Sequence, residues 1–72
     1  MLWVVTENES LQITRCNTFE KDGKHQVWVE RSNGKTFKLK ESENRSEIQE
    51  IKDAIDFAIS AKEPMLDLKA VL

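Results

Sequence analysis

The stretch QVWVERSNGKTFKLK, residues 26–40, carries the pattern on which the predicted fold depends. Apolar and polar side chains alternate on both sides of an Asn-Gly pair, which is typical of a β-hairpin. A three-residue loop over 32–34, with its glycine in the left-handed conformation, sets Val29 opposite Phe37 and keeps apolar residues on one face. A two-residue loop would pair apolar residues with charged ones on both faces, so the longer loop is expected.

A second glycine turn, residues 21–23, precedes this hairpin. With a loop of the same length, Phe19 lies opposite His25. The strand that leads into the turn, residues 11–19, is expected to bulge near residues 15–17. Both turns then predict one buried face, formed by Leu11, Ile13, Phe19, Val27, Val29, Phe37 and Leu39. The predicted outward face consists of Thr18, Gln26, Trp28, Glu30, Thr36, Lys38 and Lys40.

Residues 2–6, Leu-Trp-Val-Val-Thr, form the expected first strand, because β-branched and aromatic residues favour strands. Successive strand residues alternate between faces, so either Trp3 or its neighbours Leu2 and Val4 must point away from the core. The pattern leaves both orientations open.

From Ser42 the apolar period changes from two residues to about 3.6, which predicts a helix over residues 44–62. Ser46 with Gln49 fits a capping box, and Ser42 is a looser alternative start. Pro64 ends the helix. The apolar stripe expected to face the sheet consists of Ile48, Ile51, Ile55, Ala58 and Ile59.

The tail, residues 65–72, is too apolar to extend into water. Its pattern fits a short strand about as well as one or two helical turns, and its type is left open. Phe57 widens the apolar arc of the helix to about half of the circumference, more than one small sheet requires. We expect the tail to cover that edge.

These elements predict an α+β fold: an antiparallel meander of about four strands, with one long helix packed on one face. The 72 residues are expected to form a single domain, in which residues 1–40 are the meander, 44–62 the helix and 65–72 the tail.

A family resemblance rests on four motifs and on a helix that ends in Ala58-Ile59. The motifs are Met1–Thr6, Gln26–Glu30, Ser32–Lys35 and Phe37–Leu39. Their layout resembles a loose group of small uncharacterised proteins from Gram-positive bacteria and their phages. The resemblance implies a β-meander followed by one helix, and a phage-related accessory or host-modulating role. It implies no catalytic activity.

The composition argues against an enzyme, a metal site and a cofactor. Cys16 is the only cysteine and His25 the only histidine, so no metal site built from these residue types can form within one copy. The predicted register places the two on opposite faces of the sheet. No phosphate-binding or dinucleotide glycine motif occurs. A lone thiol without a membrane-spanning run is typical of a cytoplasmic protein.

Two surfaces are candidates for binding. A protein interface, which implies a homodimer or an unidentified protein partner, would use apolar side chains expected at the surface. These are Trp3, Trp28, Phe57, Met65, Leu66 and Leu68. The alternative function is a single-stranded nucleic-acid-binding module that uses Trp28, Lys38 and Lys40. The net charge of −2 weighs against nucleic acid, and we expect a non-enzymatic, self-associating interaction protein.

Overall fold

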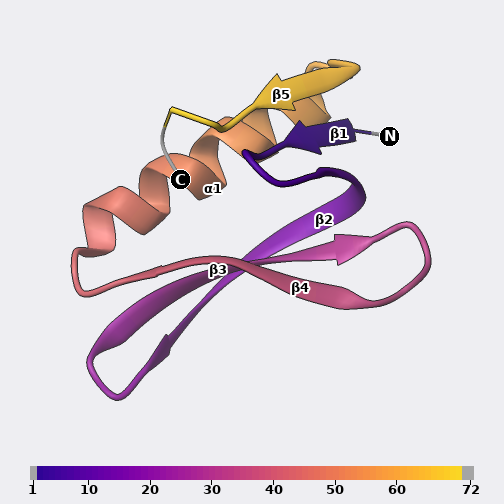
Figure 1. Ribbon diagram of the computed structural model, residues 1–72. Coiled ribbons are helices and arrows are strands. Elements are labelled where there is room, and N and C mark those ends of the chain that lie inside the picture. The colour runs from indigo at the N-terminus through magenta and orange to yellow at the C-terminus, as the bar shows by residue number, and fades with distance from the viewer. Residues whose placement is uncertain (1, 71–72) are drawn as a thin grey trace.

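The computed structural model of the chain describes residues 2–70. In this part of the chain, a strongly twisted sheet forms one layer, and a single helix packs along one side of it (Figure 1). In chain order, the elements are β1 (Leu2–Val5), β2 (Ser10–Lys21), β3 (Lys24–Arg31), β4 (Thr36–Ser42), α1 (Arg45–Ser60) and β5 (Met65–Asp67).

Within residues 2–70, the sheet has five strands in the order β4-β3-β2-β1-β5. The pairs among β1 to β4 are antiparallel, whereas β5 pairs with β1 in parallel. The predicted α+β class is confirmed, with one strand more than expected. The additional strand comes from the tail, whose type the sequence left open. Residues 71 and 72 of the predicted tail lie outside the described residues.

The hairpin of β3 and β4 has the predicted loop. Gly34 has a φ of +86°, and Arg31 N–H donates to the Lys35 carbonyl at 2.7 Å. Val29 lies opposite Phe37 and Trp28 opposite Lys38, as predicted. Trp28 therefore points to the side of the sheet away from α1, while Val27 and Val29 are buried beneath the helix.

The hairpin of β2 and β3 has a shorter loop than predicted. Asp22 and Gly23 have φ values of 54° and 78°, as in a two-residue turn of type I′. Phe19 consequently lies opposite Gln26, not opposite His25. The prediction that Phe19 belongs to the core is wrong, because this register turns it to the outward side, where its exposed fraction is 56%.

Two irregularities change which residues face the helix. Thr14 is an extra residue between the ladder partners Ile13 and Arg15, close to the expected bulge. The alternation shifts there, so Cys16 faces the core and lies opposite Val29, while Thr18 joins the helix side. Thr18 was predicted on the outward face.

The second irregularity lies in β4. Leu39 is an extra residue between Lys38 and Lys40, the partners of Trp28 and Val27. Leu39 packs against the core, and Lys40 also reaches the helix side. The prediction that Lys40 points outward is wrong, because one additional residue moves a side chain to the other face of a strand.

The core lies between the sheet and one stripe of α1. Leu2 and Val4 are buried and Trp3 is 45% exposed, which resolves the orientation of β1. The predicted stripe faces the sheet, with Ile59 half-buried at its margin. The buried residues are Leu2, Val4, Leu11, Ile13, Cys16, Val27, Val29, Ile48, Ile51, Ile55, Ala58 and Leu68. Phe37, which was predicted to be buried, is exposed at the edge strand β4.

Both ends of α1 differ from the prediction. Asn44 is the N-cap, because its Oδ1 accepts a hydrogen bond from Ser46 N–H at 3.0 Å. The helix ends at Ser60, and Lys62 N–H and Glu63 N–H donate back to the carbonyls of Ile59 and Ala58. These two bonds form a Schellman motif.

The Schellman motif ends the helix before Pro64 is reached, and the chain then returns beside β1. The Pro64 carbonyl accepts from Trp3 N–H at 3.1 Å, and Leu68 N–H donates to the Val5 carbonyl at 2.9 Å. The tail therefore extends the sheet and does not cover Phe57. The prediction that the tail covers Phe57 is wrong, and Phe57 remains 70% exposed.

Lys62 occupies the left-handed position of the Schellman motif, with a φ of 56°. Glycine adopts this conformation without a Cβ clash, so Lys62→Gly is expected to raise the unfolding free energy by about 0.5–1 kcal/mol. Urea unfolding measures this change. Ala61→Gly is the control, because Ala61 has an ordinary φ of −80° and its replacement should destabilise the protein. A destabilised Lys62→Gly protein would contradict the assignment.

Candidate functional site

The side of the sheet opposite α1 carries an open hollow of about 680 Å³ over β2, β3 and β4. We call this the Trp28 hollow. Its lining includes Trp28, Phe19, Asn17, Gln26 and Lys38. Asn17 lies directly opposite Trp28, and Phe19 opposite Gln26, so Phe19 is a diagonal neighbour of Trp28 on the same face. Aromatic side chains reach each other across such diagonals.

A chain of hydrogen bonds holds the polar side of the hollow in place. Trp28 Nε1 donates to Gln26 Oε1 at 2.8 Å, and Gln26 Nε2 donates to Glu41 Oε1 at 2.6 Å. Lys38 Nζ lies 3.8 Å from the same carboxylate oxygen. The hydrogen bond from Gln26, together with the attraction of nearby lysines, lowers the pKa of Glu41. The indole is thereby fixed in orientation beside a charged rim.

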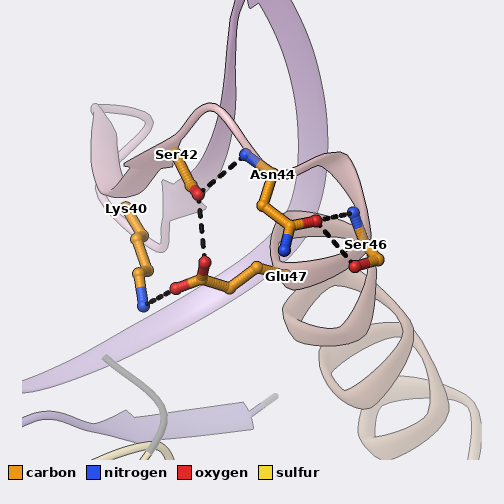
Figure 2. Close-up of polar contacts among 5 residues, drawn as sticks. All are labelled: Lys40, Ser42, Asn44, Ser46 and Glu47. Carbon is orange, nitrogen blue, oxygen red and sulfur yellow. Dashed lines mark hydrogen bonds and ion pairs between the residues drawn. The ribbon is translucent and has the colours of Figure 1, made fainter.

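Lys40 does not belong to this surface, although it was predicted beside Trp28 and Lys38. Its Nζ lies 2.5 Å from Glu47 Oε1 on α1. Ser42 Oγ donates to the other oxygen of Glu47 at 3.0 Å and accepts from Asn44 N–H at 3.0 Å (Figure 2). Lys40 thus helps to join β4 to the first turn of the helix.

The six predicted interface residues are distributed over different parts of the molecule. Trp3 and Met65 are register partners on β1 and β5, where both are largely exposed. Phe57 projects from α1. Leu66 packs against the core and Leu68 is buried within it, because β5 continues the sheet under the helix.

Cys16 and His25 lie on the same side of the sheet, contrary to the predicted opposite faces. Their ladder positions on β2, Cys16 and the Glu20 that faces His25, are four residues or about 13 Å apart. Burial raises the pKa of the Cys16 thiol to about 11. His25 Nε2 lies 3.7 Å from Glu20 Oε2. This geometry does not bring a thiolate and a base together.

Within residues 2–70, no three His, Cys, Asp or Glu side chains gather in an arrangement suited to a metal ion. In the same part of the chain, no helix has the length and apolar character needed to cross a membrane.

Sequence reasoning missed two contributors to the Trp28 hollow, Phe19 and Asn17. Phe19 was assigned by a register that differs by one residue from the observed one, whereas Asn17 fell within the expected bulge and was assigned to no face. The Asp-Gly pair at 22–23 was the available signal, because this pair favours a two-residue loop.

Comparison with known proteins adds no residue roles to this surface. No known protein family, curated protein or solved structure matches the chain. The resemblance to small proteins of Gram-positive bacteria and phages stays a prediction.

Glu47→Gln is expected to weaken the pH dependence of stability. Hydrogen bonds from Lys40 and Ser42 lower the pKa of Glu47 from its ordinary 4.5, so the folded state favours the carboxylate. The resulting stabilisation is present above about pH 4.5 and is lost as the pH falls through the lowered folded pKa. Urea unfolding at pH 7 and at about pH 3 should show a smaller difference for the variant than for the wild type. Glu43→Gln, which removes the same charge outside this network, should keep the wild-type difference in unfolding free energy between the two pH values. If Glu47→Gln also keeps the wild-type difference, the assignment is contradicted.

The Cys16 thiol is expected to react slowly in the folded protein. A rise in its pKa from 9.0 to about 11 reduces the thiolate at pH 8 by about 100-fold, and burial excludes the reagent as well. Absorbance with Ellman's reagent measures the rate, with the protein in a denaturing concentration of guanidinium chloride as the control. Fast reaction of the folded protein would instead indicate an accessible, activated cysteine.

Proposed function

We propose that the chain is a non-enzymatic interaction protein that binds a protein partner through the Trp28 hollow. The observation that carries the proposal is the aromatic pair of Trp28 and Phe19 on the side of the sheet that α1 does not cover. Aromatic anchors in pockets supply much of the binding energy of protein interfaces. The accessory or host-modulating role implied by the family resemblance is compatible with such a module.

The setting of the aromatic pair supports binding by a preformed surface. Phe19 is more than half exposed, so a partner that covers it removes apolar surface from water. The indole of Trp28 is already oriented by Gln26 and so loses little side-chain freedom on binding. Asn17 lies opposite Trp28, two residues before Phe19 on β2, and offers an amide to a partner.

Binding of single-stranded nucleic acid is the second candidate, favoured by Trp28, Phe19 and Lys38 on one face. Acidic groups on this face argue against it. Glu41 lies beside Lys38, and Glu30 Oε1 lies 3.6 Å from Arg15 Nε. A phosphate backbone that crosses the sheet meets both carboxylates, whereas a protein can match separate charges of either sign.

The test is photocrosslinking in cells that naturally express the chain. A benzophenone amino acid replaces Asn17, which lines the hollow, or Asn8, which lies in the exposed turn between β1 and β2. The variant at position 17 is expected to yield a protein adduct, and the matched variant at position 8 is not.

The adduct identifies the class of partner. Loss of the adduct on nuclease treatment would replace the proposal by the nucleic-acid alternative. Absence of any adduct at position 17, or equal adducts at both positions, would overturn the proposal.

A further inference from the structure

The outward face of the sheet and the exposed side of α1 differ in net charge. On the outward face, Lys21 lies opposite Lys24, and both attract Glu41, the carboxylate that Lys38 also contacts. With the pair of Arg15 and Glu30, the charged side chains of this face are Arg15, Lys21, Lys24, Lys38, Glu30 and Glu41. Four are basic and two acidic, and Glu20 also contributes to the lining of the hollow, so basic side chains around the hollow outnumber acidic ones by four to three.

The exposed surface of α1 has the complementary character. Phe57 lies far from the buried stripe on the helix circumference, and Asp53 precedes it by one turn. Glu50 lies nearly one turn before Asp53, and both carboxylates are exposed. Phe57 is therefore an unpartnered aromatic side chain at the end of an acidic stripe.

We propose that the Trp28 hollow of one copy receives Phe57 from a second copy of this chain, an inference that rests on the proposed function. Phe57 then stacks with Trp28 and Phe19, since aromatic rings gain stability beyond the area they bury. Asp53 and Glu50 approach Lys21, Lys24 and Lys38 at the rim. The contact joins opposite charges as well as apolar surfaces.

Other ways of joining two copies fit these residues less well. A symmetric contact between two outward faces opposes three lysines to the same three lysines. Pairing along β4 is hindered by the Leu39 bulge and by lysines on both sides of it. Pairing along β5 is limited to a three-residue strand that follows Pro64.

The arrangement has a consequence for assembly. The hollow and Phe57 lie on opposite layers, so two copies cannot fill each other's hollow at the same time. A head-to-tail contact of this kind leads to open chains of copies. An interface of usual size takes about 800 Å² from each partner, about one-sixth of the 4861 Å² that the chain exposes. One layer of the molecule supplies an area of this order.

Sedimentation velocity over a range of concentrations provides the first test. The wild type is expected to form a series of species beyond the dimer, with association that weakens as salt is added. Phe19→Glu and Phe57→Glu should each weaken association at least tenfold. Met65→Glu is the matched control, because it places the same charge at an exposed apolar position outside both surfaces. Circular dichroism verifies that each variant is folded.

Mixing Phe19→Glu with Phe57→Glu, the two variants expected to associate poorly on their own, provides the second test. The Phe19→Glu protein retains Phe57, and the Phe57→Glu protein retains the hollow, so their mixture should form a complex that stops at one copy of each. A mixture that remains monomeric overturns the proposal, as does association that Phe57→Glu leaves unchanged.

The outcomes separate the two proposals. If the wild type is monomeric at every concentration, the proposal that a second copy occupies the Trp28 hollow is overturned. If the benzophenone at position 17 then captures a protein of a different mass, the proposed function stands. If it captures none, both fail.

Discussion

The architecture depends on one amphipathic helix that buries one face of one sheet. Ile48, Ile51 and Ile55 form the centre of its stripe, and they pack over Val27 and Val29. A chain of this length has too little apolar material for a second covering layer. In residues 2–70 the other face of the sheet carries no helix, so an aromatic side chain placed there has water or a partner as its neighbour. The burial of one face thus determines which residues are available for binding.

How far the sequence predicts this arrangement is clearest from its two hairpins. Around Asn33-Gly34, the loop geometry and the apolar pattern favour the same register, which is the observed one. Around Asp22-Gly23 they disagree. Placing Phe19 in the core requires a three-residue loop, whereas Asp-Gly favours two residues with positive φ, and the local backbone preference prevails. Phe19 lies only three residues from Asp22, so the turn determines its register and the apolar pattern was a poor guide there.

Two further differences within the sheet come from single extra residues, which leave no clear mark in an apolar pattern. Thr14 shifts the alternation of β2 and brings Cys16 into the core. Leu39 does the same in β4 and carries Lys40 to the helix, so that of the predicted nucleic-acid face only Trp28 and Lys38 remain together. Each bulge depends on hydrogen bonds with a neighbouring strand. Reasoning along one strand at a time therefore cannot place it.

The basic and acidic parts of the sequence lie in different layers of the molecule, because the first part of the chain forms most of the sheet and the second part includes the helix. Residues 1–40 hold seven basic and five acidic side chains and form most of the sheet, whereas residues 41–72 hold four basic and eight acidic ones and include the helix. Where the two parts meet, Lys40 and Glu47 form an ion pair that joins the layers. The charges on the outer sides of the sheet and of the helix cannot pair within one molecule, because the two outer sides face away from each other. The sheet and the helix therefore present charges of different net sign on opposite sides of the molecule, and the proposed head-to-tail contact rests on this arrangement.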